Sequence, residues 1–259
     1  MTVAPALLCG VLGLAVGSFL NVVIHRVPLG HSVVSPPSHC PGCDAPIRPR
    51  DNVPVLGWLL LRGRCRDCGE PISARYPLVE GLTAALFVVV SVSIGAHAEL
   101  PAFLYLAAVG VALAAIDLDT KRLPNALTLP SYAVGLVLLG VAALVQGEPT
   151  PFVRAVEGMA SLYAFYFLLC YGTAGKGMGF GDVKLAGVLG LYLGWLGWPQ
   201  LLVGSFAAFA LGAVVSIGLV LGAGAGRKTR VPFGPFLVAG ALLAVVAGAP
   251  IARTWLGAA

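Results

Sequence analysis

The stretch that decides the fold reads PAFLYLAAVGVALAAIDLDT, residues 101–120. No charged side chain precedes Asp117 in it, and it has about the 20 residues that a helix needs to cross the ~30 Å hydrocarbon core of a bilayer. Similar apolar runs recur along the whole chain. Of the 259 residues, 58% are hydrophobic and 10% are charged, against about 25% charged in an average soluble domain. The sequence therefore predicts an integral membrane protein.

We predict an all-α polytopic fold of about eight transmembrane helices. The predicted spans are residues 4–24, 78–97, 101–117, 125–145, 152–171, 183–197, 199–222 and 235–257. The sixth is short and interrupted by glycines. The first is not a cleaved signal peptide, because no Lys or Arg precedes Arg26 and no small-residue cleavage site follows the apolar run. Gly13 and Gly17 in this span have the spacing that lets two helix backbones approach closely in lipid.

The basic residues predict the orientation. If the first span runs from outside to inside, fourteen of the 16 Lys and Arg residues lie in the inner loops or at their edges. They are Arg26, Arg48, Arg50, Arg62, Arg64, Arg66, Arg75, Lys121, Arg122, Lys176, Lys184, Arg227, Lys228 and Arg230. Only Arg154 and Arg253 fall on the other side. This positive-inside pattern places the N-terminus outside and explains the net charge of +5 without a nucleic-acid partner.

Residues 25–77 interrupt the apolar pattern, being rich in Pro, Arg, Cys and Gly. The expected organisation is a first transmembrane helix (1–24), a cytoplasmic loop domain (25–77) and a helical membrane core (78–259). The loop contains two CxxC pairs separated by 21 residues. Its four cysteines are Cys40, Cys43, Cys65 and Cys68.

This cysteine spacing is typical of a zinc ribbon or knuckle, in which each pair supplies two thiolates to a tetrahedral metal. Gly42 and Gly69 suit the tight turns that such knuckles require. Two disulfides are the alternative, but they need an oxidising compartment, whereas the loop is expected in the cytoplasm. Four thiolates leave no open coordination position, so we expect a structural zinc. His39 is expected to be a bystander.

Carboxylates at the ends of spans are costly and therefore informative. Asp117 and Asp119 close the third span, and Asp182 opens the sixth in the segment GMGFGD, residues 177–182. By the predicted topology they share a depth near the inner face, where two carboxylates can divide the acid and base roles of an aspartic peptidase. The alternative is that they cap helices or pair with Lys121, Arg122, Lys176 or Lys184. The glycines before Asp182 allow close backbone approach.

Several separated segments together resemble the type IV prepilin peptidases. They are GSFLNVVIHRVP (17–28), the cysteine loop with DNVP (51–54) and RYPLVE (75–80), DLDT (117–120) with Leu123-Pro124, GFGD (179–182) with VKL (183–185), and PFGPF (232–236). The resemblance covers essentially the whole chain. It implies an aspartic peptidase of the bacterial inner membrane that removes the basic leader of prepilins and pseudopilins on the cytoplasmic side.

By motif position the resemblance makes Asp117 and Asp182 the catalytic pair. Supporting roles are expected for Asp119, Gly179, Gly181 and Lys184. Members with the cysteine loop commonly also methylate the new N-terminal amine with S-adenosylmethionine, and this second activity rests on the resemblance alone. The expected partners are prepilin or pseudopilin substrates and membrane lipid. The methyl-donor site and the oligomeric state are not predicted.

One residue departs from the family pattern, since the motif that often ends in Pro-Asp ends here in Pro124-Asn125. Asn125 lacks the charge but still forms hydrogen bonds, so we expect peptidase activity to survive. Three other functions stay open: an ion-coupled transporter, a non-catalytic assembly factor that docks a partner through the zinc loop, and a membrane aspartic protease with other substrates. A transporter is expected to show inverted repeats, and none is apparent.

Overall fold

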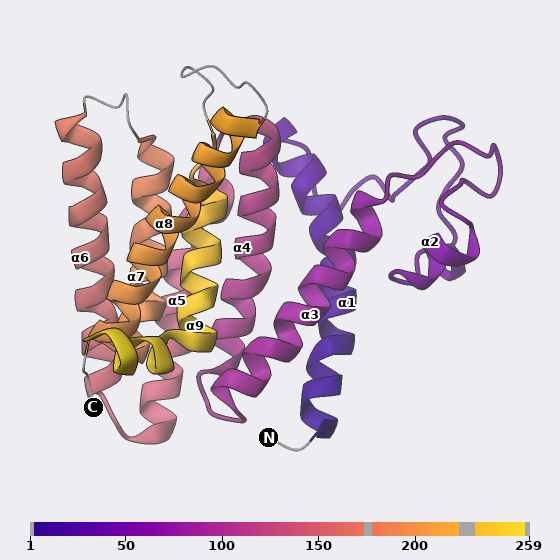
Figure 1. Ribbon diagram of the computed structural model, residues 1–259. Helices are drawn as coiled ribbons and strands as arrows, with labels where there is room; N and C mark the ends of the chain where they lie inside the picture. Colours follow the sequence, from indigo (N-terminus) through magenta and orange to yellow (C-terminus); the bar gives the residue numbers. More distant parts are fainter. Residues whose placement is uncertain (1–2, 174–177, 223–230, 257–259) are drawn as a thin grey trace. The chain divides into compact units, whose positions relative to one another are not determined.

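The computed structural model describes residues 3–173, 178–222 and 231–256, and within these ranges it contains helices and no strand (Figure 1). The eight predicted spans are all helices. They are α1 (Val3–Arg26), α3 (Arg75–Ile94), α4 (Leu100–Thr120), α5 (Asn125–Gln146), α6 (Thr150–Gly172), α7 (Phe180–Leu196), α8 (Trp198–Gly222) and α9 (Gly234–Leu256). Seven of these are long and apolar enough to cross a membrane. The predicted all-α polytopic fold is confirmed.

The chain divides into two compact units, Met1–Val92 and Ser93–Ala259. In the first unit, α1 and α3 approach closely at two glycines of α1. A Cβ added at Gly13 would lie 2.7 Å from Ala84 Cα, and one at Gly17 would lie 2.7 Å from Glu80 Cα. The predicted close helix approach is therefore confirmed. The segment between these helices holds η1 (Val27–Leu29), η2 (Pro49–Asp51) and α2 (Leu56–Leu60).

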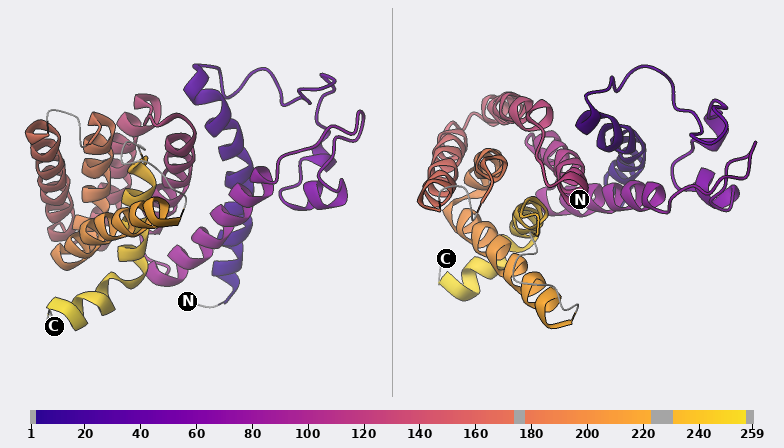
Figure 2. Two further views of the ribbon diagram at one scale, coloured as in Figure 1. Left: turned by 45° about the horizontal axis from the view of Figure 1, so that its top comes forward. Right: turned by 90° about the horizontal axis from the view of Figure 1, so that it is seen from above.

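In the second unit, α7 is the helix that the others surround (Figure 2). It has 17 residues, and every residue from Leu185 to Trp195 is buried. Glycines on both helices permit this enclosure. A Cβ added at Gly158 of α6 would lie 2.6 Å from the carbonyl oxygen of Gly190, and one at Gly194 of α7 would lie 2.5 Å from the carbonyl oxygen of Arg154. The predicted sixth span is thus covered by protein rather than lipid along most of its length.

The second unit brings three helix ends together. The last turn of α4, the first turn of α7 and the first turn of α9 lie at one end of the unit, because α4 contacts the start of α9 and the connection after α4 contacts the start of α7. Three short segments distant in sequence are thereby placed at a common depth. Four basic residues of the predicted inner loops lie outside the described residues: Lys176, Arg227, Lys228 and Arg230.

Candidate active site and metal centre

Asp117 lies in the last turn of α4, facing the interior of the unit. Its residue is 5% exposed, and its Oδ2 accepts a hydrogen bond from the backbone N–H of Gly234 at 3.0 Å. Gly234 is the first residue of α9, where backbone N–H groups lack helical partners and the helix dipole favours negative charge. A Cβ added at Gly234 would lie 2.6 Å from this same oxygen. The carboxylate is therefore held by backbone at a position that only glycine leaves open.

Asp182 lies in the first turn of α7 and is half-buried. Its Oδ2 accepts a hydrogen bond from the backbone N–H of Gly179 at 3.1 Å, while its own N–H donates to the Gly179 carbonyl oxygen at 3.0 Å. Asp182 thus caps the start of α7, which was the alternative to a catalytic role that the sequence left open. Capping leaves its second carboxylate oxygen available, since an ionised carboxylate accepts up to about four hydrogen bonds.

The structure brings Asp117 and Asp182 within electrostatic reach of each other. Within the described part of the chain, neither aspartate belongs to an ion pair, so the predicted alternative of pairing with Lys121, Arg122 or Lys184 does not hold there. Asp119 is exposed, two residues beyond the buried Asp117 on α4. The two carboxylates thus come from neighbouring helix ends of one unit, where Leu123 adjoins both Gly181 and Gly234, and Asp119 lies on the exposed side of α4.

The predicted supporting residues contact the start of α7. A Cβ added at Gly181 would lie 3.1 Å from Leu123 Cβ, so glycine lets α7 lie against the connection that follows α4. Lys184 Nζ donates a hydrogen bond to Asn125 Oδ1 at 2.8 Å and lies 4.9 Å from the centre of the Phe180 ring. Asn125 therefore still forms the hydrogen bond expected of it. Gly179 contacts Asp182 through both its backbone N–H and its carbonyl oxygen.

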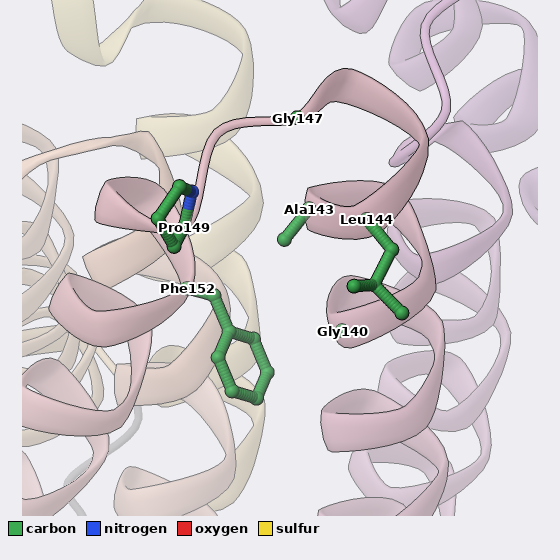
Figure 3. A pocket seen from close by; sticks show the side chains of 6 residues that line it. All are labelled: Gly140, Ala143, Leu144, Gly147, Pro149 and Phe152. Carbon is green, nitrogen blue, oxygen red and sulfur yellow. The ribbon is translucent and has the colours of Figure 1, made fainter.

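A cavity of about 510 Å³ lies between α5 and α6, near their connection (Figure 3). It is lined by Gly140, Ala143, Leu144, Gly147, Pro149 and Phe152. None of these side chains can ionise, and the cavity lies at the opposite end of α5 from Asn125. The titratable groups suited to catalysis are thus at the other end of the unit.

The four loop cysteines lie in two turns of the same construction. The Cys40 N–H donates to the Ala45 carbonyl oxygen at 3.0 Å, and the Cys65 N–H donates to the Glu70 carbonyl oxygen at 2.8 Å. The left-handed residue of each turn comes four positions after its first cysteine, at Asp44 (φ 55°) and Gly69 (φ 76°). The prediction for Gly69 is confirmed. Gly42 also lies in its turn, but the left-handed conformation there falls on Asp44, and a Cβ at Gly42 would contact Glu70 Cγ at 3.3 Å.

The cysteine sulfurs suit a tetrahedral metal. All four lie within 4.8 Å of one another, and the Cys40 and Cys68 sulfurs are 3.7 Å apart. Zn–S bonds of about 2.3 Å place neighbouring sulfurs about 3.8 Å apart in a tetrahedron. All six cysteines are free thiols, so the disulfide alternative is not realised. Backbone N–H groups of Cys68 and Asp67 lower the pKa of Cys65 to about 7, whereas the pKa of Cys68 is raised, because the hydrogen bond from the Glu70 backbone is outweighed by contacts with the neighbouring thiols. A bound zinc ion favours the thiolate form of its ligands.

Polar contacts hold the two turns of the loop together. Arg66 forms a bidentate pair with Asp51, its Nη2 lying 2.6 Å and its Nε 2.9 Å from the carboxylate oxygens. The hydrogen bond from Arg66 lowers the pKa of Asp51. Arg48 pairs with Asp67 at 2.8 Å. His39 contacts the Pro37 carbonyl oxygen and Asp44 and lies outside the sulfur cluster, as expected of a bystander.

Two family descriptions match this chain. The bacterial peptidase A24 N-terminal domain matches residues 11–94, and the type IV leader peptidase family matches residues 103–217. The prepilin leader peptidase/N-methyltransferase of Aeromonas hydrophila is 38% identical over 94% of this chain and 91% of its own length. The chain belongs to the type IV leader peptidase family. The assignment made from the motifs is confirmed.

Other relatives in the family carry the same name. That of Klebsiella pneumoniae is 44% identical over 73% of this chain and 86% of its own length, and that of Pseudomonas putida is 38% identical over 93% and 90%. No solved structure matches the chain.

The sequence motifs did not predict one contact of the candidate site, the hydrogen bond to Asp117 from the first residue of α9. Gly234 lies in the PFGPF segment, which was noted only for its resemblance, and it contributes the hydrogen bond to Asp117. A glycine followed by proline at a helix start is the available signal, because proline favours the first turn of a helix. That signal says nothing about which side chain the free N–H group meets.

Proposed function

We propose that this chain is a membrane aspartic endopeptidase that cleaves the basic leader of type IV prepilins or pseudopilins at the cytosolic face of the bacterial inner membrane. The observation that carries the proposal is the approach of Asp117 and Asp182 from separate helices, each oriented by a backbone N–H group and neither neutralised by a described basic side chain. Two such carboxylates suit the shared-proton chemistry of aspartic peptidases.

In the proposed mechanism, the ionised carboxyl group takes a proton from a water molecule as the water oxygen attacks the scissile carbonyl carbon. The protonated carboxyl group donates its proton to the carbonyl oxygen. The C–N bond then breaks and its electron pair goes to nitrogen, which takes the proton that the first carboxyl group gained from water, while a hydroxyl of the resulting diol returns a proton to the second carboxylate as the carbonyl re-forms. Backbone donors suit this work because they are oriented before the reaction begins.

The proposed depth of the site follows from the basic residues. Lys121, Arg122 and Lys184 adjoin the aspartates in sequence. Arg154 instead donates to the Gly194 and Trp195 carbonyl oxygens at the far end of α7, and Arg253 lies in the last turn of α9, far from its start at Gly234. By the positive-inside rule, the aspartate end is cytosolic, with the N-terminus of the chain outside.

We further propose that the loop domain, residues 25–77, serves N-methylation of the new N-terminus, while the membrane core, residues 78–259, serves cleavage. Cys40, Cys43, Cys65 and Cys68 would hold a structural zinc. S-adenosylmethionine would supply an electrophilic methyl group to the substrate amine. The names of the relatives and the cysteine geometry support this division.

Conservative substitution of each aspartate tests the peptidase. In proteoliposomes, Asp117→Asn and Asp182→Asn are each expected to lower prepilin cleavage by at least about 10²–10⁴-fold, since each removes an acid or base. Asp119→Asn is the matched control and is expected to be mild, because Asp119 is exposed. Mass spectrometry of the product reports leader removal and methylation separately. Substantial cleavage by either variant, correctly inserted, would remove that residue from the pair.

A further inference from the structure

Two phenol groups are buried without a hydrogen-bond partner. The residues Tyr166 of α6 and Tyr192 of α7 are each 0% exposed, and neither hydroxyl has a partner among the residues that the structure describes. Buried hydroxyl groups nearly always find partners, so each exception asks for an explanation. The two tyrosines differ in what lies near them.

The register of α6 and α7 places Tyr166 at the level of Asp182. The two antiparallel helices touch where Gly158 meets the carbonyl oxygen of Gly190. Both helices rise about 1.5 Å per residue. Eight residues after Gly158 is Tyr166, and eight residues before Gly190 is Asp182. In agreement with this register, the Tyr166 phenol is within electrostatic reach of Asp182, whereas Tyr192 is within reach of Tyr105 instead.

The ring of Tyr166 is held by aromatic neighbours. It stacks on Phe209 of α8, with ring centres 5.7 Å apart and 12° between planes, and it meets Phe165 edge to face at 5.4 Å. Phe209 in turn contacts Phe233 at 5.3 Å, directly before the glycine that binds Asp117. The ring therefore has little freedom, and its hydroxyl is kept near the aspartate end of the unit.

We propose that Tyr166 is a positioning residue of the peptidase site, whose hydroxyl donates a hydrogen bond to Asp182, directly or through one water molecule. This inference rests on the proposed function. Gly179 occupies one carboxylate oxygen of Asp182, and a second acceptor oxygen is available to the phenol. Such catalytic contacts are often long before substrate binds and shorten afterwards. Among the residues that the structure describes, the other ionisable group that acts on Asp182 is Asp117 of α4, and Lys184 is engaged by Asn125.

Tyr166→Phe keeps the ring and removes the hydroxyl group, and Tyr192→Phe is its matched control on the neighbouring helix. Tyr166→Phe is expected to lower kcat for prepilin cleavage by about ten- to hundredfold, the range for losing a hydrogen bond to a charged group. KM is expected to stay unchanged, Tm to fall by the contribution of the lost hydrogen bond, and the acidic limb of the pH profile to move toward neutral pH, because the carboxylate form of Asp182 loses a donor. Tyr192→Phe is expected to cleave within about twofold of the unsubstituted chain, because it loses no partner.

A double-mutant cycle tests the same contact without activity. Thermal unfolding in detergent of Tyr166→Phe, Asp182→Asn and the double variant is expected to show non-additive effects, whereas the Tyr192→Phe cycle with Asp182→Asn is expected to be additive. Unchanged kcat in Tyr166→Phe, or additivity in its cycle, overturns the inference. If the unsubstituted chain cleaves no prepilin while the Tyr166 cycle is non-additive, the proposed function fails and the contact stands.

Discussion

At the scale of single residues, Asp117 and Asp182 are held in the same way. Each carboxylate accepts one hydrogen bond from a glycine N–H at a helix start, from Gly234 in one case and from Gly179 in the other. Backbone donors are fixed by the helices, whereas side-chain donors must be ordered at an entropic cost. The remaining carboxylate oxygens are available to water and substrate and, on Asp182, to the hydroxyl group that we propose Tyr166 supplies. We infer that a pair of glycines, as much as the pair of aspartates, defines this site.

The residue that departs from the family pattern gives a prediction at this scale. Asn125→Asp would turn the 2.8 Å hydrogen bond from Lys184 into an ion pair, which at a solvent-accessible position stabilises a protein by about 0–1 kcal/mol. We therefore expect Tm to rise slightly and prepilin cleavage to persist. Cleavage rates and thermal unfolding of both forms measure this. Loss of cleavage would mean that the neutral side chain is needed here.

At the scale of elements, the start of α9 depends on the absence of a side chain. Gly234→Ala would place a Cβ 2.6 Å from Asp117 Oδ2, so the carboxylate or the helix must move. Because displacement of a catalytic group by about 1 Å can cost about 10²-fold in rate, we expect a loss of that order in cleavage. The readout is kcat in proteoliposomes.

Gly218→Ala in α8 is the matched control, because a Cβ there would meet nothing within 4 Å. Alanine in a helix is also favoured over glycine by about 1 kcal/mol, so this variant is expected to be at least as stable and fully active. Equal activity of Gly234→Ala and Gly218→Ala would show that the contact with Asp117 is dispensable.

The paired turns of the cysteine loop give a prediction about metal. Protein purified without chelators is expected to contain about one zinc per chain, because four closely placed thiolates complete a tetrahedral site. Cys65→Ser is expected to lose the metal and destabilise the loop, lowering methylation more than cleavage. Elemental analysis and product mass spectrometry measure these effects.

Cys9→Ser is the control for metal binding, since Cys9 lies in α1 outside the cluster. It is expected to keep its zinc. Metal-free protein with the four loop thiols joined as disulfides would contradict both the zinc assignment and the cytoplasmic position of the loop.

At the scale of the whole molecule, the depth of the aspartates limits how substrate is presented. A prepilin has its scissile bond between a basic leader and an apolar helix, and that junction lies near the cytosolic face where we propose the site. The apolar helix can pack laterally on the membrane helices, as small-residue faces allow. A substrate reduced to leader and apolar helix is therefore expected to be cut at the same bond in membranes.

Mass spectrometry of the products identifies the bond cleaved. The full-length prepilin is the control for enzyme activity, and protease protection verifies that the short substrate is inserted. Resistance of the inserted short substrate, while full-length prepilin is processed, would show that the globular domain takes part in recognition.

Sequence alone determined the features that depend on local composition and spacing. Long apolar runs predicted the eight long helices of the described residues, because a helix satisfies its own backbone hydrogen bonds in lipid. Two CxxC pairs predicted the sulfur cluster, because a knuckle is built from consecutive residues. Asp117 and Asp182 were also recognisable from their own segments, because a carboxylate at the end of an apolar span is energetically costly.

Only the tertiary structure decided which distant residues meet. Gly234 is 117 positions from Asp117, and nothing in either segment specifies the other, because their contact follows from how α4 and α9 pack. The enclosure of α7 likewise depends on surrounding helices rather than on its own hydropathy. Even in the loop, spacing favoured Gly42 as the turn residue, whereas backbone hydrogen bonding placed the left-handed conformation on Asp44. Local patterns name the candidates, and packing over long sequence distances decides which of them share a site.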